Sequence, residues 1–284
     1  MRFGYSPCPN DTFAFYAAKE GKVGEPFEVE HHDVETLNRR AFEGRYEVTK
    51  LSFGALGRLL DDYALLRSGG ALGRGVGPIV VAREGIEPAE LASDDTDVVI
   101  PGELTTAHLL LQLHSRSFEA ADERIFDEIM PAVADGGYDA GLVIHEGRFT
   151  YQDHGLTQVL DLGEWWEKET GAPVPLGCIA VRRDVEDPGR IEEALSASVG
   201  YARDRRGDKG LPDDDDLRGY VREHADEIDD DVLRRHIDLY VNGYTVDMGD
   251  EGVRAVETLF TRAREAGILP DTDADDLLAV RSRS

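Results

Sequence analysis

The chain is short of lysine and of long apolar runs, and each shortage excludes a class of protein. Only five of its 284 residues are lysine, and 58 acidic residues against 31 basic ones give a net charge of −27. No basic stripe is available to contact phosphates, which disfavours nucleic-acid binding. No apolar run reaches the ~20 residues of a membrane helix, and the opening MRFGYSPCPND lacks the basic and apolar parts of a secretory signal. We therefore expect a cytoplasmic protein with neither a membrane nor a nucleic-acid partner.

Cysteine is also scarce. Cys8 and Cys178 lie far apart in the sequence, and neither has the spacing of a metal ligand. A lone pair without a secretory signal predicts two reduced thiols and no disulfide.

The acidic residues are spread along the whole chain instead of forming one tail. This distribution is less typical of an acidic interaction protein than of a protein dissolved in molar salt, where screening shortens charge repulsion to ~3 Å. We therefore interpret the sequence as halophilic. The one true acidic run, Asp213 to Asp216, is expected to be a solvated loop.

The stretch Asp139 to Phe149, DAGLVIHEGRF, is the clearest site signal. Its first half is a continuous small and apolar run, typical of a strand buried on both faces, and it ends at His145 and Glu146. Ligands bind at the carboxyl edge of open α/β sheets, and histidine suits proton transfer near neutral pH. The alternative is a histidine that only caps a strand.

Polar residues also mark the carboxyl ends of three other predicted strands, at Arg2 to Tyr5, Tyr46 to Phe53 and Thr96 to Ile100. These residues are Ser6, Asn10 and Asp11, then Lys50 and Ser52, then Thr105 and Thr106. The two threonines precede a predicted helix, whose free N–H groups suit a carboxylate or phosphate. Structural roles stay open: Asn10, Asp11 and the threonines could only cap helices, and Lys50 could only form an ion pair.

Alternating strands and helices predict parallel sheets with helical crossovers. A helix is predicted over Glu123 to Ala134, with Ile125, Ile129 and Val133 on one face. The last third is predicted to be almost wholly helical, with an extended link over Val241 to Met248. The segment Gly69 to Gly77, GGALGRGVG, lacks the spacing of a phosphate-binding loop, and we interpret it as a flexible segment near a crossover between domains.

Other catalytic signatures are incomplete. His145 and Glu146 begin like the zinc motif H-E-x-x-H, but Phe149 stands where the second histidine belongs. No G-x-S-x-G motif of a hydrolase is present. The alternating strands and helices, together with the four polar strand ends, predict two lobes that bring these ends to one cleft.

Seven ordered segments resemble one enzyme family, the 1,4-dihydroxy-6-naphthoate synthases of the futalosine route to menaquinone. They are SPCPNDTF (Ser6 to Phe13), DVETLNR (Asp33 to Arg39), TKLS (Thr49 to Ser52), RSGGALGRGVGP (Arg67 to Pro78), PGELTTA (Pro101 to Ala107), AGLVIHEGRFTY (Ala140 to Tyr151) and DLGEWWE (Asp161 to Glu167).

The resemblance implies an α/β protein with a two-lobed, type 2 periplasmic-binding-protein-like fold. Lobe 1 would comprise residues 1–80 and 178–284, and lobe 2 residues 81–177. It implies a lyase that converts cyclic dehypoxanthinyl futalosine into 1,4-dihydroxy-6-naphthoate without a metal or organic cofactor.

The resemblance also implies site roles. His145 would be the general base, and substrate contacts would come from two matched segments and from the first strand end. Those contacts are Lys50, Leu51 and Ser52, Thr105 and Thr106, and Asn10 and Asp11. The partner would be a small-molecule substrate, and the oligomeric state stays open.

Two alternatives share this fold. One is chorismate dehydratase of the same pathway, and the other is a non-catalytic binding protein for a small carboxylate. The SPCPNDTF and IHEGRFTY segments favour the synthase. Consumption of substrate distinguishes an enzyme from a binder, and the substrate accepted distinguishes the two lyases.

Overall fold

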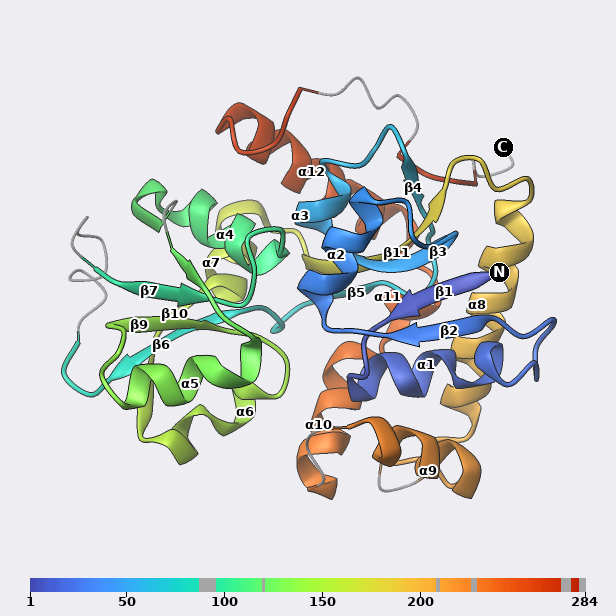
Figure 1. Ribbon diagram of the computed structural model, residues 1–284, viewed down its shortest axis with the longest axis horizontal. Coiled ribbons are helices and arrows are strands. Elements are labelled where there is room, and N and C mark those ends of the chain that lie inside the picture. The colour runs from blue at the N-terminus through green and yellow to red at the C-terminus, as the bar shows by residue number, and fades with distance from the viewer. Residues whose placement is uncertain (87–95, 119–120, 208–209, 226–228, 272–276, 281–284) are drawn as a thin grey trace.

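Two β-sheets lie side by side in the computed structural model, each with its own helices (Figure 1). The structure describes residues 1–86, 96–118, 121–207, 210–225, 229–271 and 277–280. We call the part around the first sheet lobe 1 and the part around the second sheet lobe 2.

The lobe 1 sheet has the strand order β2-β1-β3-β11-β4, with β5 also paired to β11. Its strands are β1 (Arg2–Tyr5), β2 (Glu28–His31), β3 (Val48–Ser52), β4 (Tyr63–Leu65), β5 (Ala71–Gly73) and β11 (Val174–Arg182). Strand β1 is parallel to β2 and β3, whereas β11 runs antiparallel to β3, β4 and β5. The sheet is therefore mixed.

The lobe 2 sheet has the order β10-β6-β9-β7-β8. Its strands are β6 (Ile79–Arg83), β7 (Val98–Ile100), β8 (Asp122–Glu123), β9 (Ala140–Val143) and β10 (Leu156–Asp161). Strand β7 is parallel to β8 and β9, whereas β6 is antiparallel to β9 and β10. The prediction of parallel sheets is thus wrong for β6, β10 and β11, because strand direction depends on how the chain returns between the lobes.

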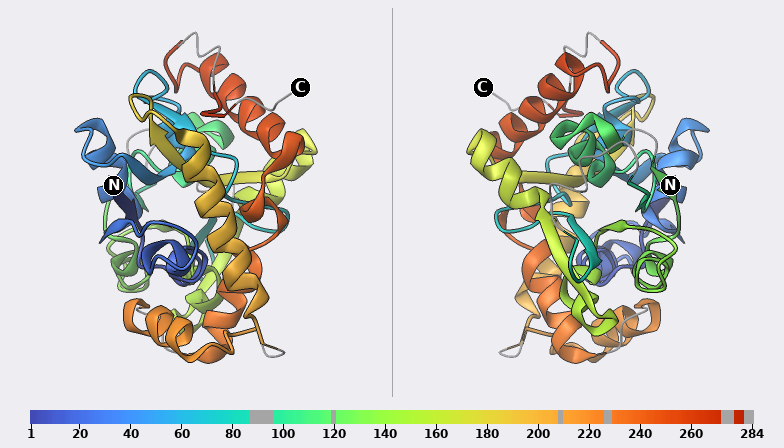
Figure 2. Two further views of the ribbon diagram at one scale, coloured as in Figure 1. Left: turned by 90° about the vertical axis from the view of Figure 1, so that its right-hand side faces the viewer. Right: turned by 90° about the vertical axis from the view of Figure 1, so that its left-hand side faces the viewer.

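Helices cover both sheets. Those that follow lobe 1 strands or come after β11 are α1 (Pro9–Lys19), α2 (Val34–Phe42), α3 (Phe53–Leu56), α8 (Pro188–Asp204), α9 (Asp215–His224), α10 (Asp230–Tyr240), α11 (Gly243–Val246) and α12 (Gly249–Glu265). Those of lobe 2 are α4 (Thr106–His114), α5 (Phe126–Ala134), α6 (Gly147–Thr150) and α7 (Leu162–Thr170), with 3₁₀ turns η2 (Arg116–Phe118) and η3 (Tyr151–His154). The side views show α8 running along lobe 1 (Figure 2).

Strand β9, which lies in the first half of the stretch Asp139 to Phe149, is buried along its whole length. A Cβ on Gly141 would lie only 2.6 Å from Ile129 of α5, so glycine lets this helix pack directly on the strand. One apolar cluster also joins the lobes, since Leu51 of β3, Leu110 of α4, Trp166 of α7 and Phe260 of α12 belong to it. The lobes therefore share part of their hydrophobic core.

The glycine-rich segment leads from β5 into β6, which places it at the crossover between the sheets. Gly77 has φ +142, and a Cβ there would lie 2.7 Å from Gly163 at the start of α7. A Cβ on Gly163 would in turn lie 1.9 Å from the carbonyl oxygen of Val76. These glycines thus permit close backbone packing between the crossover and α7. The domain boundaries after residues 80 and 177 stay a proposal.

Three local predictions are wrong. Helix α5 begins at Phe126, so Ile125 precedes it and is 59% exposed instead of joining the buried face of Ile129 and Val133. The expected extended link contains α11, which Asn242 caps. The acidic run is not only a loop, because Asp214 caps α9 and accepts the N–H groups of its first turn.

Cys8 and Cys178 are both buried and free of a disulfide. Across the described ranges, no helix is long and apolar enough to cross a bilayer.

Candidate active site

A cavity between the lobes brings together all four polar strand ends. Lobe 1 contributes Ser6, Asn10, Asp11, Val34, Lys50, Ser52 and Ala71. The crossover and lobe 2 contribute Gly77, Pro78, Thr105, Thr106, Ala107, Ile144 and His145, and the returning chain contributes Leu176, Gly177, His236 and Tyr240. The cavity encloses about 680 Å³ of space, including its opening to solvent.

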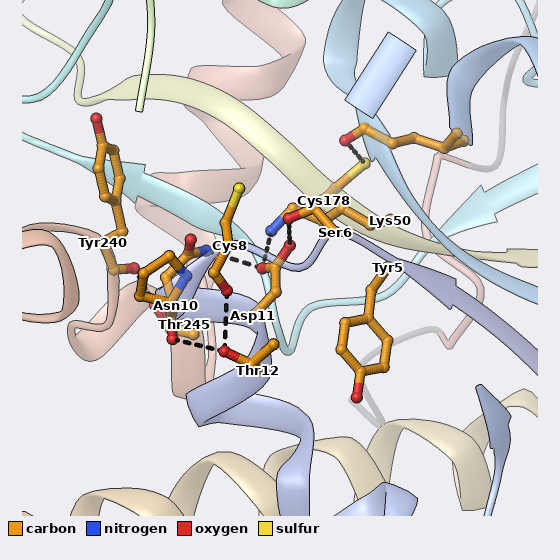
Figure 3. Close-up of polar contacts among 12 residues, drawn as sticks. Tyr5, Ser6, Cys8, Asn10, Asp11, Thr12, Lys50, Cys178, Tyr240 and Thr245 are labelled. Atoms are coloured by element: carbon orange, nitrogen blue, oxygen red, sulfur yellow. Dashed lines mark hydrogen bonds and ion pairs between the residues drawn. The ribbon is translucent and has the colours of Figure 1, made fainter. Parts of the chain in front are cut away.

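Asp11 is the centre of the lobe 1 wall. It lies in the first turn of α1, is 2% exposed, and accepts a hydrogen bond from Lys50 Nζ at 2.6 Å. Ser6 Oγ and Asn10 Nδ2 donate to the same carboxylate at 2.7 and 2.8 Å (Figure 3). A buried lysine and a buried aspartate are thus compensated by each other and by two neutral donors.

His145 lies directly beyond the carboxyl end of β9, where its backbone has φ +54. No other non-glycine residue in the described part of the chain has a positive φ, and such a conformation costs about 1–3 kcal/mol. The ring Nδ1 lies 3.6 Å from Cys8 Sγ of lobe 1, and the Phe126 ring packs edge-on against the imidazole at 5.1 Å. Contacts from both lobes therefore hold this ring in the cavity wall.

The electrostatic surroundings keep His145 neutral near pH 7. Exclusion of water is the largest influence and lowers the pKa of His145 from 6.5 to about 4, while the carboxylate of Asp11 opposes this effect and the Lys50 ammonium adds to it. A neutral imidazole has a free lone pair, which is the form that a general base requires. Burial also raises the pKa of the Cys8 thiol, which keeps it protonated beside the ring.

Thr105 and Thr106 stand at the amino terminus of α4. Thr105 is its N-cap, with Oγ1 accepting the His108 N–H at 3.1 Å and donating to the Gly102 carbonyl at 2.7 Å. Thr106 Oγ1 donates to the Leu176 carbonyl at 2.5 Å. Because both hydroxyls bond to protein and Thr105 Oγ1 accepts the His108 N–H, the N–H groups of Thr106 and Ala107 at the start of α4 are the donors that suit an anion.

Ser52 connects the cavity to a second contact between the lobes. Its Oγ accepts Asn38 Nδ2 at 3.2 Å, and Asn38 also donates to Glu35 Oε2 at 3.3 Å. The Glu35 carboxylate then accepts the Leu104 N–H of lobe 2 at 3.2 Å. Next to it, Arg39 forms ion pairs with Glu35 and with Glu123 of lobe 2.

His236 and Tyr240 were not among the predicted site residues. They lie one turn apart on α10 and form part of the cavity wall. His236 Nε2 is 2.9 Å from Asn10 Oδ1, its ring centroid is 6.3 Å from that of His145, and its Nδ1 is 3.5 Å from Glu146 Oε2. The sequence signal that could have indicated His236 is its position on the apolar face of a predicted helix, together with Leu233 and Ile237.

One predicted contact residue lies elsewhere. The Leu51 side chain is fully buried in the hydrophobic core and is absent from the cavity wall. Trp166 is likewise a core residue, with its indole N–H donating to the Pro173 carbonyl at 3.2 Å. Within the described ranges, no group of three or more histidine, cysteine or acidic side chains could hold a metal ion.

The chain is similar to proteins of known function along nearly its whole length. A family model described as menaquinone biosynthesis matches residues 1–265. A 1,4-dihydroxy-6-naphthoate synthase of Thermus thermophilus is 47% identical and covers 94% of this chain and 95% of its own. Another of Streptomyces coelicolor is 44% identical and covers 98% and 97%.

Solved structures show the same fold. A crystal structure of an Archaeoglobus fulgidus protein has 38% identity and a TM-score of 0.83, covering 94% of this chain and 98% of its own. The periplasmic aliphatic sulphonate binding protein of Escherichia coli has 11% identity and a TM-score of 0.63, covering 95% and 88%. The second likeness concerns the fold alone.

These matches confirm the predicted periplasmic-binding-protein-like fold, enzyme class and family. The halophilic interpretation and the cytoplasmic location stay predictions. The chain belongs to the menaquinone biosynthesis family, among its 1,4-dihydroxy-6-naphthoate synthases.

Proposed function

We propose that this protein is a carbon–carbon lyase that converts cyclic dehypoxanthinyl futalosine into 1,4-dihydroxy-6-naphthoate, with His145 as the general base. The observation that carries the proposal is the neutral imidazole of His145 in the wall of a cavity that both lobes form. The names of the two relatives, both 1,4-dihydroxy-6-naphthoate synthases, support the product, and the substrate is the one that the family resemblance implies.

The proposed base needs a substrate held against it. The N–H groups at the start of α4, next to Thr105 and Thr106, suit the carboxylate of the substrate because the positive end of the helix dipole lies there. Lys50 and Ser52 of lobe 1 line the same cavity, where Lys50 is fixed by Asp11. Asn10 and Asp11 then act mainly by holding Lys50 and the cavity wall in position.

The proposed reaction uses the driving force of aromatisation. His145 takes a proton from the sugar-derived part of the substrate, a carbon–carbon bond breaks, and its electron pair passes into the ring that becomes aromatic. A single base suffices for proton removal because the aromatic product offsets the energy of the broken bond. We further propose that the reaction takes place in the cytoplasm.

Mass spectrometry of turnover tests the proposal. The purified protein is incubated with cyclic dehypoxanthinyl futalosine in molar KCl, alongside His145→Ala and the exposed-site control His154→Ala. We expect dihydroxynaphthoate from the wild type and the control, and loss of at least a hundredfold in rate for His145→Ala. Equal rates for all three would remove His145 as the base. Binding without consumption by the folded wild type, or consumption of chorismate instead, would refute the assigned reaction.

A further inference from the structure

His236 and Glu146 form a buried pair at the cavity that the proposed roles do not use. The imidazole is 1% exposed and the glutamate side chain 17% exposed. His236 comes from α10, whereas Glu146 follows His145 in lobe 2. Their facing atoms, Nδ1 and Oε2, are 3.5 Å apart.

The hydrogen bonds of Asn10 determine which nitrogen of His236 carries a hydrogen. The Asn10 amide nitrogen donates to the Asp11 carboxylate, which only accepts. The atom that faces His236 Nε2 at 2.9 Å is therefore the amide oxygen, which is also an acceptor. His236 Nε2 must consequently carry the hydrogen of this bond.

The remaining nitrogen then faces a carboxyl oxygen. With Nε2–H in place, Nδ1 of a neutral imidazole is an acceptor, and an ionised Glu146 offers only acceptors. Two such lone pairs facing each other in a buried site repel, whereas one proton between them makes the contact attractive. We propose that the Glu146–His236 pair holds one shared proton and is the general acid that complements His145.

The charges around the pair indicate where the proton resides. Burial has the largest effect and lowers the pKa of His236, and His145 and Lys50 act in the same direction. Asp11 is the counter-ion of Lys50, and the Tyr240 ring packs at 4.8 Å from the His236 ring. These influences favour a neutral His236, so the proposal places the shared proton on the Glu146 side of the pair.

The pair has a place in the proposed reaction, on which this acid role rests. After His145 removes a proton and the carbon–carbon bond breaks, its electrons reach an oxygen of the forming ring, which becomes an oxyanion. His236 Nε2–H exchanges its bond to Asn10 Oδ1 for one to that oxygen and gives it the proton to form a product hydroxyl, while the Glu146 proton moves to Nδ1. Proton count and charge balance, because His145 gains one proton and the pair loses one.

Spectroscopy of the ligand-free protein tests the shared proton without any substrate. Infrared difference spectra of wild type and Glu146→Gln should show a protonated carboxyl band at pH 7 that the variant lacks. Nitrogen NMR, with His236→Gln to assign the signals, should show Nε2 protonated and Nδ1 hydrogen-bonded. An ionised Glu146 beside an unprotonated Nδ1 at pH 7 would overturn the proposal.

Kinetics test the acid role. We expect Glu146→Gln to lower kcat at least a hundredfold with little change in KM, and to remove the high-pH limb of the rate profile. The control Glu169→Gln, at an exposed position on α7, should match the wild type. Unchanged kcat and pH profile in Glu146→Gln would overturn the acid role. If the wild type itself forms no product, the proposed function fails, and the spectra still decide the shared proton.

Discussion

Replacing Glu35 by glutamine should change how the stability of the protein depends on pH. Glu35 is 5% exposed and contacts lobe 2 through the Leu104 N–H. Burial raises the pKa of Glu35 from 4.5 to about 7 and outweighs the bonds from Asn38, Arg39 and Leu104, which lower it. The folded protein therefore ionises this carboxyl only with difficulty.

The sign of the effect follows from proton linkage. Between about pH 4.5 and pH 7 the folded protein keeps a proton on Glu35 that the unfolded chain has lost, so stability falls as the pH rises through this window. A pKa change of this size corresponds to about 3 kcal/mol of unfolding free energy at about 1.4 kcal/mol per pH unit. Glutamine does not titrate, so the unfolding free energy of Glu35→Gln does not fall for this reason as the pH rises.

Urea unfolding at pH 4.5, 6 and 8 measures the effect. The informative quantity is the wild-type unfolding free energy minus that of Glu35→Gln, because other titrating groups cancel in the difference. We expect this difference to fall by about 3 kcal/mol between pH 4.5 and 8. The control Glu43→Gln, at the exposed end of α2, should give a constant difference. A constant or rising difference for Glu35→Gln would show that Arg39 and the Leu104 N–H dominate, and would refute the reasoning.

Three further predictions concern charge. Lys50→Met should lower the unfolding free energy, measured in urea, by about 3–5 kcal/mol, because Asp11 stays buried without its counter-ion. Adding Asp11→Asn to Lys50→Met should recover part of this loss, because the buried charge is then removed. Burial lowers the pKa of His31 from 6.5 to about 4, so stability should fall as the pH drops through that window, and His31→Gln should reduce the fall; an equal fall would contradict this. Raising KCl from about 0.1 to 1 M should raise Tm in thermal scans, because the screening length falls from about 10 to 3 Å around a net charge of −27. An unchanged Tm would contradict the halophilic interpretation.

The polar strand ends were predictable because the sequence encodes strands locally. Small and β-branched runs end where a polar residue begins, and parallel neighbours such as β7 and β9 bring those ends to one edge. Thr105, which follows β7, and His145, which follows β9, lie in the cavity wall for this reason.

Strand direction and the identity of the covering helix were not predictable. Nothing in the apolar pattern of β11 tells whether it runs with or against β3, since both directions alternate faces in the same way. The helices after β11 all have one apolar face, and only tertiary packing selects α10 to close the cavity with His236 and Tyr240. The sequence shows the glycines of the crossover. Their close packing on α7 could not be predicted, because the partner, Gly163, lies far along the chain.

The contacts around His145, the proposed base, also join the two lobes. His145 of lobe 2 touches Cys8 of lobe 1, and Glu146 of lobe 2 faces His236 of α10. Separating the lobes would remove Cys8 from the His145 imidazole and would expose the ring to water, which removes the main cause of its lowered pKa. In the proposed reaction, the contact between the lobes therefore both completes the cavity and keeps the proposed base neutral.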